Sequence, residues 1–275
     1  MERRGMTQAA PHGMSATLKA VIAAVRLVAA EEIMPRYLKV AHQRKSDGSL
    51  CTEADVAAQT ALTKKLQAIL NVPVLGEEMP AAEQHALWQS GHDGLWCIDP
   101  IDGTSNFVRG LPYFAVSVAL LRQGKSQLGV VYDPVADEVF AAESGKGAFL
   151  NGEPLVKRET AGSLQLALAN VDLKRLGARL VTQLASNPPY SSQRNFGAST
   201  LDWCYTAAGR YDVYLHGGQK LWDYAAGLLV LLEAGGHACC IENDDFAEGD
   251  IWQRSVIAAS DKKLFDEWKN WIRAQ

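Results

Sequence analysis

Residues 96–107, WCIDPIDGTSNF, constrain this chain more than any other stretch of it. An apolar run leads into two aspartates, Asp99 and Asp102, with Pro100 between them. Because proline donates no hydrogen bond to a sheet, we expect the strand to end at about this point. The Gly-Thr-Ser that follows permits a close backbone approach and can begin a helix. The stretch therefore predicts two carboxylates and free backbone N–H groups around one small volume, which suits a phosphate bound through metal ions.

Length and composition are those of an ordinary globular protein. The 275 residues suffice for one large domain or two smaller ones, and 48% of them are hydrophobic. A net charge of −4 disfavours a surface that coats nucleic acid, so we expect no nucleic-acid partner. The five cysteines form no Cys-x-x-Cys pair, which disfavours a zinc site or a disulfide framework and indicates reduced thiols in the cytoplasm.

The start of the chain indicates a flexible leader, residues 1–14, followed by a helix. In residues 15–33 apolar side chains recur at helical spacing, which predicts a stripe packed on a core. Arg26 and the pair Glu31-Glu32 interrupt the apolar run. We therefore expect neither a signal peptide nor a membrane span here, and no membrane partner.

A second helix is predicted from Thr52, a suitable N-cap, to about Leu70, with Asp55 at its third position. A short strand over residues 72–78 follows and ends in two glutamates. These glutamates, Glu77 and Glu78, and Asp223 at the start of a later predicted helix are candidates for further acids in the same site.

After residue 106 the pattern changes from helical to extended. The β-rich runs, separated by short polar segments, lie at residues 113–121, 126–132, 137–142 and 147–150. The last run ends in Asn151-Gly152, a strong turn signal. We expect these runs to pair as an antiparallel meander.

Strands and helices alternate beyond about residue 160. Strands are predicted at residues 165–171, 211–216 and 255–260, and helices at residues 173–185, 199–209, 221–236 and 261–274. The fold class expected from this order is α/β (α+β). We expect an N-terminal α+β domain, residues 15–155, that carries the antiparallel sheet, closely packed on a C-terminal α/β domain, residues 156–275.

Three kinds of site can use an Asp-x-x-Asp-Gly-Thr sequence. A calcium loop that starts at Asp99 would need a glutamate at its twelfth position, where the chain has Gly110, so this chemistry fails. An aspartyl-phosphate phosphatase would place its two acids two residues apart, whereas here the separation is three. In the third kind both carboxylates are Mg²⁺ ligands, together with acids from elsewhere. Because carboxylates about 4 Å apart repel one another by about 4 kcal/mol, such a cluster implies bound cations or, without them, raised pKa values of the carboxyl groups.

The chain resembles the inositol monophosphatase family of Mg²⁺-dependent, lithium-sensitive phosphatases. The resemblance runs from about residue 15 to residue 272 and rests on DGSLCTEAD (47–55), GEE (76–78), WCIDPIDGTSNF (96–107) and LWDYAAGLLVLLEAGG (221–236). The third and fourth motifs together are highly specific. The resemblance implies a layered αβαβα sandwich of the sugar phosphatase type, commonly a homodimer, with two or three Mg²⁺ ions in each site.

The resemblance also implies roles for particular residues. The positions that match metal ligands are Glu77, Asp99, the backbone carbonyl of Ile101, Asp102 and, from the C-terminal domain, Asp223. The backbone amides that hold the phosphate match Gly103 and Thr104, with Ser105 next to them. Asp55 and Thr104 match the pair that orients the attacking water, and Glu77 matches a ligand of the ion that activates this water.

Two departures from the family pattern concern the substrate. Most members have Thr-Thr or Thr-Lys after the glycine, where this chain has Thr-Ser. Inositol-selective members place a glutamate seven residues before Asp223, where this chain has His216. We expect His216 to weaken the preference for inositol phosphate and to admit other small phosphates, or to favour a leaving group with an acceptor or a negative charge; alternatively it caps its strand and points away. Gly197, Ala198 and Ser199, together with Asp223, still match the pocket for the leaving group.

The resemblance thus implies hydrolysis of a small polyol or sugar phosphate such as inositol 1-phosphate. A 3'(2'),5'-bisphosphate nucleotidase and a histidinol-phosphate phosphatase of the same fold stay open as alternatives. Some bacterial relatives also bind the transcription machinery and ribosomal RNA, which is a function of a different class. Because all five ligand positions carry suitable residues, we expect an active enzyme.

Overall fold

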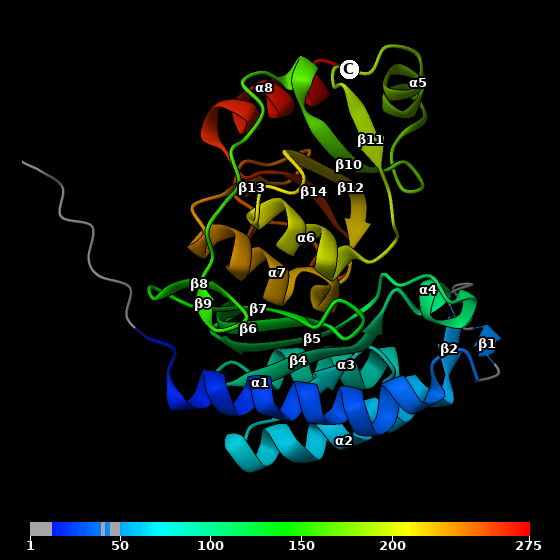
Figure 1. Ribbon diagram of the computed structural model, residues 1–275, viewed down its shortest axis with the longest axis vertical. Helices are drawn as coiled ribbons and strands as arrows, with labels where there is room; N and C mark the ends of the chain where they lie inside the picture. Colours follow the sequence, from blue (N-terminus) through cyan, green and yellow to red (C-terminus); the bar gives the residue numbers. More distant parts are fainter. Residues whose placement is uncertain (1–12, 40–41, 45–49) are drawn as a thin grey trace, which may run out of the picture.

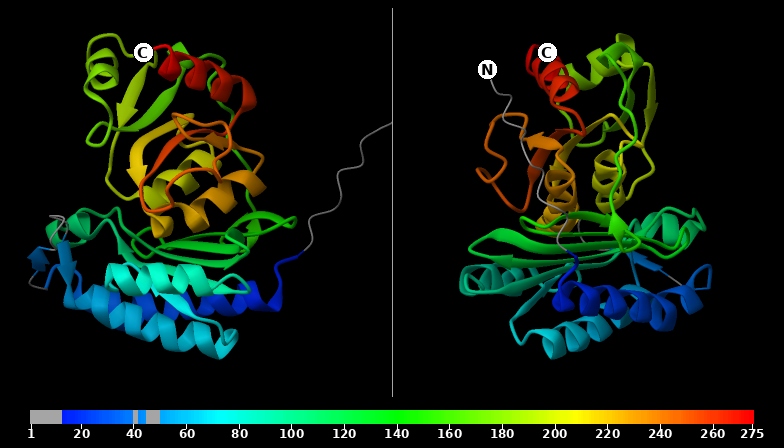
Figure 2. Two further views of the ribbon diagram at one scale, coloured as in Figure 1. Left: turned by 180° about the vertical axis from the view of Figure 1, so that it is seen from behind. Right: turned by 60° about the vertical axis from the view of Figure 1, so that its left-hand side comes forward.

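The computed structural model describes residues 13–39, 42–44 and 50–275. In these residues, layers of helices alternate with two sheets (Figure 1). The helices of the three helical layers are, in order, α1 (Ala16–Val28) and α2 (Glu53–Ile69), then α6 (Ser199–Ala207) and α7 (Leu221–Glu233), then α5 (Ala178–Ser186) and α8 (Lys262–Arg273). Two further views show the same order of layers (Figure 2). The predicted αβαβα sandwich is therefore confirmed.

A seven-stranded sheet lies between the first and second helical layers. Its strands follow in chain order: β3 (Val74–Gly76), β4 (Leu95–Asp102), β5 (Ala115–Arg122), β6 (Lys125–Asp133), β7 (Glu138–Glu143), β8 (Gly147–Leu150) and β9 (Glu153–Pro154). β3 is parallel to β4, and every later pair of neighbours is antiparallel. The predicted meander is confirmed. Helix α3 (Ala81–Ser90) connects β3 to β4.

Alternate side chains of this sheet belong to two different cores. Val139 and Ala141 of β7 pack in the core that the sheet shares with α1 and α2. Phe140 and Ala142, which alternate with them, pack in the core that the sheet shares with α6 and α7. Because successive side chains of a strand point to opposite faces, a strand covered on both faces has to be apolar throughout. The sheet is therefore covered on both faces and lies in the interior of the molecule.

A five-stranded sheet separates the second helical layer from the third. Its strands, from edge to edge, are β11 (Ser192–Arg194), β10 (Leu168–Asp172), β12 (Val213–Gln219), β14 (Arg254–Ala259) and β13 (His237–Cys239). β10 is parallel to β11 and β12, whereas β14 is antiparallel to β12 and β13. The edge strands β11 and β13 were not predicted, because three residues are too few to show an alternating pattern.

Both predicted N-terminal helices are confirmed. The Ser15 side chain accepts a hydrogen bond from the Leu18 N–H (3.1 Å) and caps α1, which continues through a π-helical turn and a 3-10 turn to Arg36. Thr52 caps α2, and Asp55 completes a capping box. The short strands β1 (His42–Arg44) and β2 (Leu50–Thr52) pair just before α2. No helix in the described ranges is both long and apolar enough to span a membrane.

Two element boundaries in the C-terminal half were predicted wrongly. The helix expected over residues 173–185 begins only at Ala178, because the Asp172 side chain accepts a hydrogen bond from the Lys174 N–H (2.7 Å) and stabilises a turn first. The strand expected over residues 165–171 begins at Leu168, after a 3-10 turn. Most of the leader predicted for residues 1–14 lies outside the described residues.

Candidate active site

Asp99 and Asp102 lie on the same side of β4 because the strand is irregular between them. In a regular strand, side chains three positions apart point to opposite faces. Here Asp99 lies opposite Ser117 of β5 and Asp102 lies opposite Ala115, so three steps on one strand match two on the other. Such a bulge redirects the later side chain. The prediction that the strand ends at about Pro100 was wrong, since β4 continues to Asp102 and accommodates the proline in its irregular part.

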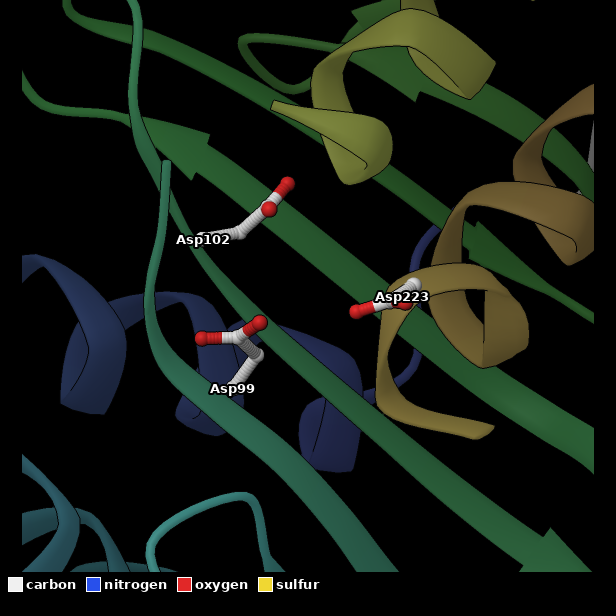
Figure 3. Close-up of side chains that lie close together, drawn as sticks. All are labelled: Asp99, Asp102 and Asp223. Atoms are coloured by element: carbon white, nitrogen blue, oxygen red, sulfur yellow. The ribbon is translucent and has the colours of Figure 1, made fainter. Parts of the chain in front are cut away.

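Asp223 reaches the same place from α7. It is the third residue of that helix, and its Oδ2 accepts a hydrogen bond from the Lys220 N–H (2.8 Å). One carboxylate oxygen each of Asp99, Asp102 and Asp223 lie within 4.8 Å of one another. Figure 3 shows the three side chains converging from the strand and the helix. We call these three aspartates the acidic floor.

Burial dominates the electrostatics of the acidic floor. Asp99 is 1% exposed, and burial, followed by the charges of Glu77 and the other two aspartates, raises the pKa of Asp99 well above its usual range. Burial likewise raises the pKa values of Asp102 and Asp223 to about 7. A nearby positive charge would stabilise the ionised carboxylates and lower these pKa values. Because every group of the floor offers oxygen, the donor set fits a hard cation such as Mg²⁺.

Glu77 and the Ile101 carbonyl border the acidic floor. Glu77 follows β3 directly, and its backbone N–H donates to the Ile98 carbonyl (3.2 Å). A hydrogen bond between the Glu77 and Asp99 side chains contributes to the raised pKa of Asp99. The Ile101 carbonyl accepts a hydrogen bond from the Thr104 hydroxyl (3.0 Å). The five residues predicted to supply metal ligands therefore lie around one cavity.

Thr200 orients Asp102. Oδ2 of Asp102 accepts hydrogen bonds from the Thr200 N–H (2.6 Å) and the Thr200 hydroxyl (2.7 Å). Thr200 is the second residue of α6 and is fully buried, so these two bonds tie the middle helical layer to the seven-stranded sheet. The sequence prediction missed Thr200, because a threonine in the first turn of a helix is common and no spacing links it to Asp102.

Asp55 and Thr104, the pair predicted to orient water, approach each other. Oδ2 of Asp55 accepts hydrogen bonds from the N–H (2.7 Å) and the hydroxyl (2.6 Å) of Thr52, while Oδ1 lies 3.4 Å from the Thr104 hydroxyl. Burial raises the pKa of Asp55 to about 7, although the two bonds from Thr52 oppose the rise. A carboxyl group that titrates near neutral pH beside a hydroxyl group can exchange a proton with it.

Gly103 turns the chain from β4 into α4 (Thr104–Arg109). Its φ of 87° favours glycine, and a Cβ there would lie 3.0 Å from the Tyr113 carbonyl oxygen. Within the described part of the chain, the backbone N–H groups of Thr104 and Ser105 make no hydrogen bond, as expected in the first turn of a helix. Both residues line the cavity, so their N–H groups can bind an anion.

The cavity has a volume of about 430 Å³. The predicted site residues that line it are Glu77, Asp99, Ile101, Asp102, Gly103, Thr104, Ser105, Gly197, Ser199, His216 and Asp223. Two predicted residues do not line it: Asp55 lies behind Thr104, and Ala198 is fully buried, 3.1 Å from where a Cβ of Gly103 would be. The lining residues that the sequence prediction missed are Arg109, Asp172, Lys174, Arg175, Asn195 and Asp202.

His216 is buried in the wall of the cavity, and both of its ring nitrogens have neighbours. Nδ1 accepts a hydrogen bond from the Gly218 N–H (3.1 Å), so the proton of the neutral ring is on Nε2. Nε2 lies 3.4 Å from Oδ2 of Asp172 and 3.5 Å from Nη1 of Arg175. Burial alone would raise the pKa of Asp172, but the hydrogen bond with His216 lowers it to about 2. His216 thus contacts the loop that follows β10.

Comparison with known families identifies one that matches almost the whole chain. The model of the inositol monophosphatase family matches residues 14–272. An inositol-1-monophosphatase of Caulobacter vibrioides is 33% identical over 238 residues, which cover 84% of this chain and 90% of the relative. A protein of Pasteurella multocida named Nus factor SuhB is 36% identical over 224 residues, which cover 78% of this chain and 80% of the relative.

Solved structures give the same result for the fold. An IMPase of Thermotoga maritima superposes with a TM-score of 0.79 at 28% identity, over 94% of this chain and 96% of that one. The extragenic suppressor protein SuhB of Bartonella henselae superposes with a TM-score of 0.81 at 27% identity, over 94% of this chain and 99% of that one. The layered architecture is therefore shared along nearly the entire length.

Proposed function

This chain belongs to the inositol monophosphatase family, and on that premise we propose that it is a Mg²⁺-dependent phosphomonoesterase that acts on a small polyol or sugar phosphate, such as inositol 1-phosphate. The observation that carries the proposal is the acidic floor, three aspartates with oxygens within 4.8 Å of one another, of which Asp99 is almost completely buried and Asp223 is half-buried. The floor lies in the same cavity as the unpaired N–H groups of Thr104 and Ser105. Groups for a cation and groups for an anion thus meet in one place, as the binding of a phosphate ester and its metal requires.

The ions would be held by the acidic floor together with Glu77 and the Ile101 carbonyl. When bound, Mg²⁺ offsets the negative charge of the phosphoryl group and makes water more acidic. The chain positions its own ligands in advance, since two hydrogen bonds from Thr200 orient Asp102 and the bulge of β4 aims Asp99. Less of the binding free energy is then lost in ordering these side chains.

Asp55 and Thr104 handle the proton of the attacking water. The Thr104 hydroxyl has a single proton, which can be donated to the Ile101 carbonyl (3.0 Å) or to Oδ1 of Asp55 (3.4 Å). When the proton is directed to Asp55, the hydroxyl oxygen can take a proton from water in the cavity while its own proton passes to Asp55, which Thr52 holds in place. The pair therefore works as a general base that needs no histidine.

A screen of phosphate esters tests the proposed function. Purified protein is incubated with Mg²⁺ and a panel of polyol, sugar, nucleoside and histidinol phosphates, and released phosphate is measured. We expect turnover of at least one polyol or sugar phosphate, its loss in excess EDTA and its recovery with added Mg²⁺. Inhibition by Li⁺ is a further expectation from the family. Undiminished turnover in EDTA, or no turnover of any ester, contradicts the proposal.

The same screen decides between the alternatives of this fold. Faster turnover of an adenosine bisphosphate or of histidinol phosphate identifies a nucleotidase or a histidinol-phosphate phosphatase. Relatives named Nus factor SuhB raise a role in transcription, which no feature of the residues described here favours over the phosphatase. Retrieval of RNA polymerase from cell extract by the tagged chain checks that role. A homodimer and a cytoplasmic location stay predictions, and light scattering checks the first.

A further inference from the structure

One part of the cavity lining, outside the acidic floor, carries positive charge. Lys174 and Arg175 line the cavity from residues 173–177, the loop between β10 and α5. Both side chains are exposed, so a bound molecule can reach them. No motif of the sequence marks these residues, and the proposed phosphoryl chemistry uses neither of them. We call this loop, with its two cations, the basic rim.

Neighbouring residues fix the position of the basic rim. Oδ1 of Asp172 accepts a hydrogen bond from the Lys174 N–H (2.7 Å), which closes the turn. A Cβ on Gly217 would lie 2.1 Å from the Arg175 carbonyl oxygen, so only glycine lets β12 and the loop approach so closely. Gly218 also lies next to the loop, and a Cβ there would be in ordinary van der Waals contact with Cδ of Arg175 (3.7 Å). The two cations are therefore carried by a packed loop that rests on β12.

Within the residues that the structure describes, the exposed cations of the basic rim form no ion pair. Ion pairs join other basic side chains to carboxylates, among them Arg26, Arg36, Lys146, Arg210, Lys262 and Arg273. In the described ranges, no carboxylate oxygen lies within the 4.0 Å of an ion pair from the charged nitrogens of Lys174 or Arg175. Asp172, the acid nearest in sequence, uses its oxygens on the Lys174 N–H and on His216.

His216 completes the argument because it lines the cavity beside this loop and carries no negative charge. Its Nδ1 accepts a hydrogen bond from the Gly218 N–H, and its Nε2 lies 3.4 Å from Oδ2 of Asp172 and 3.5 Å from Nη1 of Arg175. A carboxylate at this position would pair with Arg175 and would repel an anionic leaving group. With histidine there, the positive charge of Arg175 is available to a ligand.

We propose that the basic rim is a binding subsite for a second anionic group, so that the preferred substrate is a phosphate monoester whose leaving group carries a phosphate or a carboxylate. This inference rests on the proposed function only in taking the first anion to be the phosphoryl group on the acidic floor. The floor binds that group through cations, and the rim binds the second group directly through Lys174 and Arg175. Arginine and lysine donors to a dianion form charge-assisted hydrogen bonds that neutral groups cannot replace.

Phosphonates test the subsite without turnover, because their C–P bond is not a phosphate ester. Titration calorimetry in Mg²⁺ compares propylphosphonate with 3-phosphonopropionate, which adds a carboxylate, and with propane-1,3-diphosphonate, which adds a second phosphonate. We expect the two compounds that carry a second anionic group to bind about tenfold more tightly than propylphosphonate. A gain with the diphosphonate alone assigns the rim to phosphate, and a gain with both assigns it to either anion. Equal affinity of all three overturns the proposal.

Two variants attribute the gain to the rim. In Lys174→Gln/Arg175→Gln we expect the preference for the doubly anionic compound to fall about tenfold, and in Arg175→Glu to reverse. Arg179→Gln is the matched control, since Arg179 is an exposed cation of the neighbouring helix that does not line the cavity, and its preference should stay within about twofold of wild type. An unchanged preference in both rim variants overturns the proposal. If the protein binds the compounds with a second anionic group more tightly but hydrolyses no ester, the proposed function is contradicted and the proposed subsite is supported.

Discussion

The acidic floor and the basic rim are opposite in charge, in burial and in the way the chain builds them. The floor takes two of its three aspartates, Asp99 and Asp102, from one bulged strand in which both are buried. The rim is an exposed loop that approaches β12 closely only because Gly217 has no side chain. We infer that the floor determines whether the reaction occurs and that the rim influences which ester reacts. Changes to the floor should therefore reduce turnover, and changes to the rim should mainly alter the order of preferred substrates.

The substitution Asp99→Asn should have the largest effect. It keeps the size of the side chain but removes a carboxylate charge that the bound cations would share. We expect kcat to fall by at least about 10³-fold, which corresponds to about 4 kcal/mol of lost transition-state stabilisation. Folding should survive, because one acid fewer reduces the repulsion inside the floor.

Asp93→Asn provides the control for Asp99→Asn, since Asp93 is an exposed aspartate just before β4. Its turnover should equal that of wild type. Circular dichroism and a melting curve establish that each variant is folded. If folded Asp99→Asn keeps more than about a tenth of wild-type turnover, the floor does not work through a shared cation.

The substitution Thr104→Val removes the hydroxyl beside the floor without changing the shape of the side chain. We expect kcat to fall about 10²-fold with little change in KM, because the proton path from water to Asp55 is interrupted. Thr104→Ser keeps the hydroxyl and should stay within about tenfold of wild type. Equal turnover of the Val and Ser variants would show that the hydroxyl takes no part in the reaction.

The stability of the metal-free protein should depend on pH through the floor and Asp55. The pKa values of Asp55, Asp102 and Asp223 are raised to about 7 in the folded protein, whereas an unfolded aspartate titrates near 3.9. Between these values the folded state binds more protons than the unfolded state, so the free energy of unfolding falls as pH rises. In EDTA we expect the melting temperature to drop by about 5 °C from about pH 5 to about pH 8.

Mg²⁺ should restore most of this stability at the higher pH, where the carboxylates are ionised and can bind it. The variant Asp102→Asn should show a shallower pH dependence in EDTA, because it lacks one of the titrating groups. A melting temperature in EDTA that rises from the acidic to the alkaline buffer would contradict the proposed electrostatics of the floor.

The substitution His216→Glu should have the smallest effect, and it acts on the rim alone. The new carboxylate would pair with Arg175 and repel a second anion. We expect the ratio of kcat/KM for 2-phosphoglycerate over glycerol 2-phosphate to fall about threefold to fivefold, as exposed charge pairs typically allow. His216→Gln, which keeps a neutral donor and acceptor, should change the ratio less than about twofold. An unchanged ratio in His216→Glu would show that this wall does not select the leaving group.

The contrast between the acidic floor and the basic rim also explains which features could be predicted from the sequence alone. The Asp-x-x-Asp-Gly-Thr motif lies within six consecutive residues, and helix caps and alternating strands are local patterns, so the floor motif and most elements were predicted. The bulge that allows β4 to continue past Pro100 was not predicted, because it depends on the pairing of β4 with β5. Thr200 was missed for a similar reason, since its contact with Asp102 joins two layers.

The rim was beyond prediction from sequence. Lys174 and Arg175 lay inside a segment predicted as helix, and the turn held by Asp172 becomes apparent only when β10 is seen to end there. His216 was recognised as a departure from the family pattern, but its contact with Asp172 depends on the parallel pairing of β10 with β12. Local patterns thus identify the chemistry, whereas tertiary packing forms the part that contacts the rest of the substrate.

A crystal structure with Mn²⁺ in place of Mg²⁺ tests the central claim most directly, because Mn²⁺ accepts the same oxygen ligands and scatters anomalously. The account predicts at least one strong anomalous peak at direct ligand distance, about 2.2 Å, from carboxylate oxygens of Asp99, Asp102 and Asp223. The peak should be lost or weakened in Asp99→Asn. An active enzyme whose crystals show no Mn²⁺ among these three aspartates, or show it bound only elsewhere, would contradict the account.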